Sequence, residues 1–98
     1  MKEKIITLHP QAGKSGVNIS KQKYDLMRDT IVDIITSSGE FNFSSLPDAV
    51  NRRLKGSFSG SIGWYVTTVK LDLEARGVIE RIPKSRPQRL RLAQTSVS

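Results

Sequence analysis

Basic side chains are concentrated near the C-terminal end of the sequence, between residues 76 and 91. That segment holds six cations against the single carboxylate of Glu80, a net charge of +5. A planar guanidinium presents a fork of N–H donors that matches the oxygens of a phosphate group. We therefore expect the segment to bind a polyanion: nucleic acid first, then an acidic protein surface or anionic lipid, with a merely solvated basic face as the alternative. The six cations are Arg76, Arg81, Lys84, Arg86, Arg89 and Arg91.

The other reactive or ligating side chains are too few or too poorly spaced for catalysis. His9 is the only histidine and the chain has no cysteine, which leaves no thiolate or histidine cluster for a metal. Asp72 and Glu74 lie two residues apart on a predicted helix and point in different directions. The tripeptide Gly-Lys-Ser at residues 13–15 resembles part of a phosphate-binding loop, but Leu8 stands where that loop needs its first glycine. We therefore expect no enzyme, no cofactor, no metal and no small-molecule ligand.

Length and composition describe one small domain. The chain has 98 residues and a net charge of +7, with 37% hydrophobic and 26% charged residues, which suits a single core with loose ends. No stretch approaches the length of a membrane span, and the N-terminal residues hold no apolar run long enough for a signal peptide. We expect a cytoplasmic protein that has no membrane partner.

An N-terminal arm is predicted over residues 1–19. Its apolar residues Ile5, Ile6 and Leu8 favour a short strand, which the following His-Pro pair ends. Residues 11–18 are rich in turn-forming residues.

The first predicted helix runs from Ser20, a suitable N-cap, to Gly39, a suitable left-handed stop. Its apolar residues recur every three or four positions, which is the helical period. Residues 40–43 follow as a short linker whose two phenylalanines are expected to reach the core. The apolar stripe comprises Tyr24, Met27, Ile31, Ile34 and Ile35.

Two further helices are predicted in the middle of the chain. The second starts near Ser45, which forms a capping-box-like pair with Asp48, and it ends at a glycine after a cationic last turn. The third is capped by Ser59 or Ser61 and ends at Gly77. Their apolar faces consist of Leu46, Ala49, Val50 and Leu54 in the second helix and Ile62, Val66, Val69 and Leu73 in the third.

A β-hairpin is predicted after the third helix. Residues 78–82 and 88–92 read as strands, and two prolines bracket the basic turn between them. Leu90 and Leu92 share one face of the second strand, and its two arginines point outward from the other face. Because a lone hairpin is marginal in water, these leucines and Val78 are expected to pack against the helices.

Three helices followed by a basic hairpin form the outline of the winged-helix superfamily. The residues that carry this resemblance are Val66, Leu73 seven residues later, and the run Gly-Val-Ile-Glu-Arg at residues 77–81. This spacing resembles that of small bacterial transcription regulators of the MarR and PadR kinds. Residues 20–92 also resemble a small, functionally uncharacterised bacterial winged-helix family that carries the run GWYVTTVKLDLEARG. The resemblance implies a mainly α (α+β) fold, a winged helix-turn-helix, with a disordered tail at residues 93–98.

The resemblance also implies a function and a set of contacts. In winged helices the third helix lies in the major groove and the hairpin reaches the phosphate backbone or the minor groove, so the expected partner is double-stranded DNA and the expected role is transcription regulation. Thr67, Thr68 and Lys70 would contact base edges, which are read by hydrogen bonds. The phosphate contacts would come from Lys84, Arg86, Arg89 and Arg91 in the hairpin and from Arg52, Arg53 and Lys55 in the second helix.

An interaction module without nucleic-acid binding is the alternative. Trp64, Leu71 and Ala75 lie opposite the core stripe at about 100° per residue, where a DNA-reading helix usually shows polar side chains. Their presence indicates that the arm or a second subunit covers this face, so a homodimer is the second expected partner. Trp64 itself is suited to stacking on a base, anchoring a dimer or covering a neighbouring helix. RNA is a third partner that charge alone leaves open.

Overall fold

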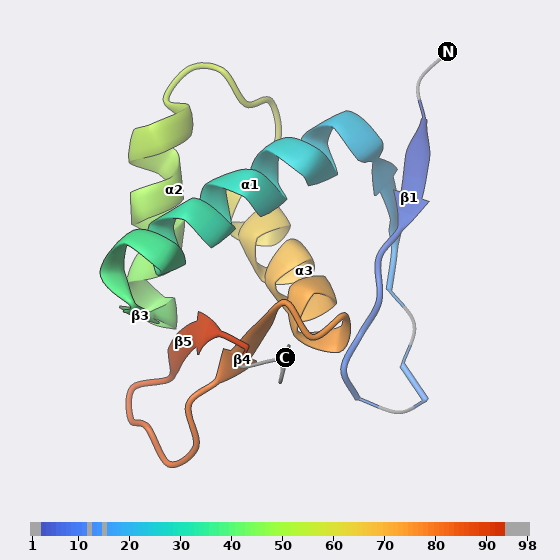
Figure 1. The fold of residues 1–98 in the computed structure, drawn as a ribbon. Coiled ribbons are helices and arrows are strands. Elements are labelled where there is room, and N and C mark those ends of the chain that lie inside the picture. The colour runs from blue at the N-terminus through green and yellow to red at the C-terminus, as the bar shows by residue number, and fades with distance from the viewer. Residues whose placement is uncertain (1–2, 12, 15, 94–98) are drawn as a thin grey trace, which may run out of the picture.

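Three helices and two small antiparallel sheets make up the described part of the chain (Figure 1). The computed structural model describes residues 3–11, 13–14 and 16–93, and within them it confirms the α+β class. No helix in this part is long and apolar enough to span a bilayer. Of the tail expected to be disordered, residues 93–98, only Ala93 is described, and its N–H donates to the Val78 carbonyl at 3.0 Å; residues 94–98 lie outside the described residues. In chain order the elements are β1 (Lys4–Ile6), β2 (Asn18–Ser20), α1 (Lys21–Ser38), β3 (Glu40–Asn42), the 3-10 turn η1 (Phe43–Ser45), α2 (Leu46–Leu54), α3 (Ile62–Ala75), β4 (Ile79–Arg81) and β5 (Arg89–Leu92).

Helix α1 begins and ends where its capping residues predict. The Ser20 Oγ accepts a hydrogen bond from the Lys23 backbone N–H, and Gly39, at a φ of 80°, donates its N–H to the Ile35 carbonyl. Both bonds satisfy backbone groups that a helix end otherwise leaves unpaired. The predicted apolar stripe is confirmed as core, because Tyr24, Met27, Ile31, Ile34 and Ile35 are all buried.

The segment between α1 and α2 is a strand, so the prediction of a linker at residues 40–43 is wrong. Residues 40–42 form β3, and Phe41 pairs with Leu90 of β5. The Ser45 side chain makes no capping hydrogen bond at the start of α2, so the predicted capping box with Asp48 does not form. The apolar face of α2 is nevertheless buried as expected, with Val50 and Leu46 fully enclosed.

Helix α3 lies against both α1 and α2 and completes the core. Ser61 is its cap, since the Ser61 Oγ accepts a hydrogen bond of 3.2 Å from the Trp64 N–H. Val66, Val69 and Leu73 have no exposed surface. After the helix, Gly77 takes a φ of 76°, a left-handed conformation that glycine adopts without steric cost.

The predicted hairpin is part of a three-stranded sheet with the order β3-β5-β4, in which β5 is central. Leu90 of β5 lies opposite Phe41 on one side and Arg81 on the other, and it is fully buried, as is Ile79. Leu92 and Val78 remain 37% exposed, so the prediction that they pack against the helices is wrong. Leu92 ends the sheet, and Val78 precedes Ile79 and therefore points to the opposite face.

The arm forms a hairpin of its own, β1 with β2, in which Ile5 pairs with Ile19. Thr7 extends it, because its N–H donates to the Val17 carbonyl at 2.8 Å and its Oγ1 accepts from the Val17 N–H at 2.8 Å. Gly16 allows this close approach, since a Cβ there would lie 2.0 Å from the Thr7 carbonyl oxygen. The hairpin runs along one side of the molecule beside α1 and α3 (Figure 1).

Candidate nucleic-acid interface

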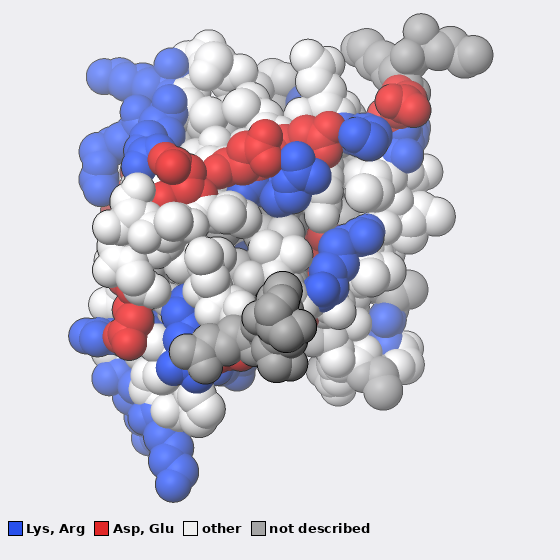
Figure 2. Space-filling view, viewed as in Figure 1, with Lys and Arg blue, Asp and Glu red and all other residues white. Residues whose placement is uncertain are grey.

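The turn between β4 and β5, here called the wing tip (residues 82–88), presents two exposed cations, Lys84 and Arg86. Ser85 fixes the turn between them: its Oγ donates to the Ile82 carbonyl at 2.8 Å and accepts from the Arg89 N–H at 3.0 Å. Neither cation forms a salt bridge with any other described residue. Basic side chains project at the lower left of Figure 2, where Figure 1 has this turn. The wing tip thus exposes two cations to solvent, and the hydrogen bonds of Ser85 fix the backbone that carries them.

The two arginines of β5 are both paired with carboxylates, which the sequence did not predict. The Arg91 Nε donates to the Glu80 Oε2 at 2.5 Å, and an Arg89 guanidinium nitrogen lies 3.5 Å from the Glu40 Oε1. Glu40 belongs to β3, the strand that the sequence did not predict. This face of the sheet therefore carries two cations and two carboxylates. Because the side chains are part-exposed, each pair contributes only about 0–1 kcal/mol to stability.

Lys70 is buried, so the prediction that it contacts base edges is wrong. Its side chain is 3% exposed, its Nζ lies 2.8 Å from the Glu74 Oε1, and the same nitrogen sits 4.6 Å from the centroid of the Phe43 ring. Arg81 of β4 approaches the second oxygen of Glu74 at 4.0 Å. Lys70 therefore joins α3 to the segment between β3 and α2 and to the sheet, and it has no surface for a ligand.

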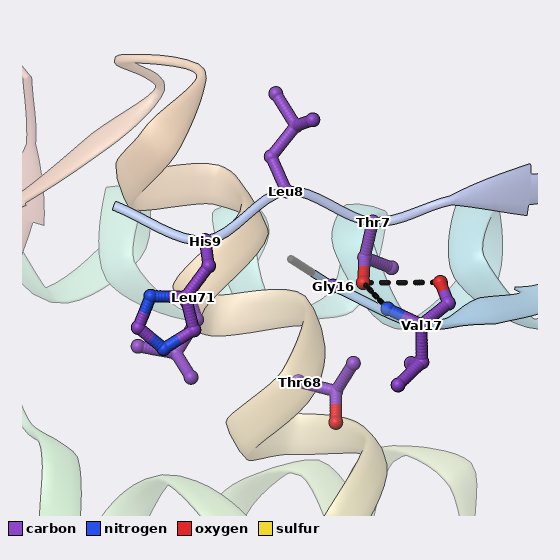
Figure 3. Close-up of a pocket in the computed structure, with 7 residues that line it drawn as sticks. All are labelled: Thr7, Leu8, His9, Gly16, Val17, Thr68 and Leu71. Atoms are coloured by element: carbon purple, nitrogen blue, oxygen red, sulfur yellow. Dashed lines mark hydrogen bonds between the residues drawn. The ribbon is translucent and has the colours of Figure 1, made fainter. Parts of the chain in front are cut away.

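The arm covers part of the face of α3 that lies opposite the core. Thr68 and Leu71 line a cavity of about 110 Å³ together with Leu8, His9 and Val17 of the arm (Figure 3). The sequence left open whether the arm or a second subunit covers this face of α3, and in the structure the arm covers part of it. Ala75 lines a second, larger and more open hollow beside the arm. Thr67 and Trp64 are the two residues of the predicted site on α3 that are exposed.

Asp72 is a fully buried carboxylate that joins three elements, and its role was missed by sequence reasoning. The Tyr24 hydroxyl of α1 donates to Oδ2, the Leu8 N–H of the arm donates to Oδ1 at 2.7 Å, and the Arg76 Nε lies 2.9 Å from both oxygens. The one available signal was the four-residue spacing between Asp72 and Arg76, which places an ion pair on one helix face. Asp72 thus fixes the arm against α3.

Tyr24 makes the stability of this cluster depend on pH. Burial first, and then the hydrogen bond to Asp72, raise the pKa of Tyr24 from 10.0 to about 12. A group whose pKa is raised by folding adds stability below its unfolded pKa and loses it as pH rises through the folded pKa. We expect the free energy of unfolding, measured with urea, to fall by about 2–3 kcal/mol between about pH 10 and 12. Tyr24→Phe, which cannot ionise there, should show a much smaller decline, and an equal decline in both proteins would contradict this prediction.

The C-terminal turn of α2 holds the second group of cations predicted to contact phosphate. Arg52 and Lys55 are exposed and form no salt bridge with the described residues. Arg53 is also exposed, but it pairs with Asp33 of α1. Figure 2 shows the basic side chains of this turn at the upper left and those of the wing tip at the lower left, with uncharged and acidic side chains between the two groups.

Acidic side chains follow the exposed side of α1 and limit where a polyanion can bind. Asp25, Asp29 and Asp33 recur at four-residue spacing, and Figure 2 shows the resulting stripe across the viewed face. Lys21 and Arg28 pair with members of this stripe. The α1 side therefore offers little free positive charge, in contrast to the edge formed by the wing tip and the end of α2.

Comparison with known proteins gives the family of the chain. No curated protein and no solved structure is significantly similar to it. One family model matches residues 4–90, from the first residue of β1 into β5, and so includes the arm, all three helices and the wing tip. With nearly the whole described chain covered by that match, the protein belongs to the family described as "Family of unknown function (DUF6958)".

Proposed function

We propose that the protein is a winged-helix protein that binds double-stranded DNA as a small, non-catalytic transcription regulator. The observation that supports this most directly is the pair of solvated cation groups on one edge of the molecule, Arg52 with Lys55 and Lys84 with Arg86. Exposed, unpaired cations bind the DNA backbone by releasing its condensed counterions. The order of three helices and a basic hairpin agrees with the winged-helix outline.

In this proposal α3 contributes through its N-terminal half. Thr68 lies beside the arm and Lys70 is buried, which leaves Thr67 as the exposed hydrogen-bonding side chain of the predicted set. Helix-turn-helix proteins contact base edges with the N-terminal residues of the reading helix. Few side chains can therefore contact base edges, so the contacts between cations and DNA phosphates provide most of the affinity. Sequence preference at a single site is modest.

Salt dependence of binding measures the proposed phosphate contacts. Four free cations predict a slope of about −3.6 in log K against log salt, at about 0.9 per neutralised phosphate. The double variant Lys84→Ala/Arg86→Ala should bind a short duplex more weakly and show a slope of about −1.8. Fluorescence anisotropy of a labelled duplex over a range of salt concentrations gives both slopes.

A charge-matched variant separates site-specific contacts from net charge. Lys21→Ala/Arg28→Ala also removes two positive charges, but from the acidic stripe of α1, so its slope should remain close to that of the wild type. Equal slopes for the two double variants would reject the wing tip as a phosphate site. If the wild type binds no DNA at low salt and light scattering reports a dimer, the alternative of an interaction module is favoured. Trp64, the exposed member of the predicted interface, and the exposed side chains Ile6 and Leu8, which share one face of the arm, would then be its candidate contacts.

A further inference from the structure

Trp64 is an exposed aromatic side chain whose ring is held in place by its neighbours. It is 44% exposed, and its ring meets the Tyr65 ring nearly at a right angle, with centroids 4.9 Å apart. The Tyr65 ring in turn meets the Phe58 ring at 77°, with centroids 5.0 Å apart. A perpendicular contact covers at most one face of the Trp64 ring. The three rings form a chain, here called the aromatic row, that leads from the loop before α3 to the open surface.

The loop between α2 and α3 is built around the aromatic row. Gly60, at a φ of 117°, passes so close to the Tyr65 ring that a Cβ would lie 3.0 Å from its Cε2 atom. Ser61 next to it caps α3 through the Trp64 N–H. Both contacts fix the backbone that carries Trp64, so binding a flat ligand on this ring requires little ordering of the protein.

A cation and two hydroxyl groups lie beside the aromatic row. The Lys23 Nζ is 5.4 Å from the Tyr65 ring centroid and 5.7 Å from that of Phe58, and it forms no salt bridge with the described residues. A hollow of about 370 Å³ at this position is also lined by Ser57 and Ser59. Free positive charge and the Ser59 hydroxyl suit a sugar–phosphate backbone, whereas an apolar protein surface would leave them unpaired. The Ser57 hydroxyl already donates to the Leu54 carbonyl at 2.9 Å.

The hydrogen-bonding side of α3 is too small to read a paired duplex well. With Lys70 buried and Thr68 beside the arm, Thr67 alone of the predicted readers is exposed. An indole face, by contrast, makes no hydrogen bonds to base edges but stacks on any base that has left the helix stack. The surface around Trp64 is therefore suited to an unpaired base more than to the edges of paired ones.

We propose that Trp64 stacks on an unpaired base, with Lys23 neutralising a neighbouring phosphate, so that the preferred partner is nucleic acid with a single-stranded segment. This inference rests on the proposed function, because it assigns a substrate class to the same nucleic-acid interface. A DNA duplex with a locally open segment offers both paired backbone for the solvated cations and a free base for the indole.

The single tryptophan of the chain makes the stacking directly measurable. Intrinsic fluorescence should be quenched by a DNA duplex with a central run of mismatches and by a DNA single strand, and little changed by the fully paired duplex. Quenching by an RNA single strand of the same sequence is compared with that by the DNA strand. Equal quenching indicates that the base alone is recognised, and a difference indicates that the sugar is recognised as well. Anisotropy of labelled DNA should give about tenfold tighter binding to the mismatched duplex than to the paired one.

Variants of Trp64 separate stacking from charge. Trp64→Leu should remove the preference for the mismatched duplex and leave affinity for the paired duplex unchanged, whereas Trp64→Phe should keep most of the preference because it retains a ring. Lys23→Gln should weaken single-strand binding and reduce the salt slope by about 0.7. Thermal unfolding of each variant establishes that it is folded.

The outcomes distinguish this inference from the proposed function. Equal quenching by the paired and mismatched duplexes, or Trp64→Leu with its preference intact, would overturn stacking on an unpaired base while duplex binding stands. A failure of the wild type to bind paired duplex, mismatched duplex or either single strand at low salt would overturn both. Quenching by single strands with no affinity for paired duplex would support the stacking site and reject duplex binding.

Discussion

Replacing Asp72 by Ala should lower the free energy of unfolding by about 2–5 kcal/mol, because the buried carboxylate is the acceptor for donors from two other elements. Without the carboxylate, the buried Tyr24 hydroxyl and the Leu8 N–H lose their acceptor, and each unpaired buried group costs about 1–3 kcal/mol. Arg76 is partly exposed and can turn to water. Urea denaturation followed by circular dichroism measures the loss.

Two further variants show that the effect belongs to this cluster. Asp29→Ala removes an exposed carboxylate from α1 and should change the free energy of unfolding by no more than about 0.5 kcal/mol. Asp72→Asn keeps one acceptor oxygen and should recover part of the stability lost in Asp72→Ala. Hydrogen exchange of the Leu8 amide should be faster in Asp72→Ala because the arm has lost its contact with α3. Stability within about 1 kcal/mol of the wild type would show that Asp72 does not hold these elements together.

Replacing Leu90 by Ala should cost about 2–5 kcal/mol, the range for a buried leucine truncated to alanine. Leu90 lies in the central strand, fully enclosed, with Phe41 and Arg81 on its two sides. Its removal leaves a cavity where the sheet meets the helices, and so it weakens the attachment of the wing tip to the rest of the domain. Chemical denaturation gives the size of the loss.

The same strand supplies the control for Leu90. Leu92 lies two residues further on, is 37% exposed and buries less apolar area, so Leu92→Ala should cost no more than about 1.5 kcal/mol. A larger loss for Leu92 than for Leu90 would contradict the strand register. The duplex affinity of the two folded variants should also differ, because only Leu90→Ala loosens the sheet that carries Lys84 and Arg86.

The helices were predictable because their signals are local. The side chain of Ser20 and the conformational freedom of Gly39 act on backbone groups within four residues, and the apolar stripe of α1 needs only its own period. Ser61 caps α3 in the same way. Each of these signals lies within a single helix and its caps, so no knowledge of the rest of the fold was needed.

The strand β3 and the burial of Lys70 were not predictable because their partners lie elsewhere in the chain. Residues 40–42 contain a single apolar residue, Phe41, which is too short a pattern to indicate a strand, and the partner Leu90 comes 49 positions later. Lys70 lies one helical turn after the exposed Thr67, and a lysine at such a position is expected at the surface. In the structure the Phe43 ring and Glu74 enclose its ammonium group.

The sequence predicted where the exposed cations of the candidate site lie, but it overestimated how many of them are free of carboxylate partners. The exposed cations of the wing tip follow from the two prolines and the basic residues between them, which are adjacent in sequence. The pairing of Arg89 with Glu40 depends on β3 and could not be anticipated. A count of charges along a segment overestimates its free positive charge when the fold places a carboxylate from another element beside it.

The central position of β5 sets the order in which the protein can fold during its synthesis. Both outer strands precede β5 in the chain, so a polypeptide still emerging from the ribosome holds two strands that have no partner. Synthesis runs at about 5–20 residues per second and domains fold as units, so the sheet closes only after the last of its strands has left the exit tunnel. Until then the backbone groups of β3 and β4 remain open to pairing with other chains. A fragment that ends before residue 89 would therefore keep β3 and β4 unpaired and able to pair with strands of other chains.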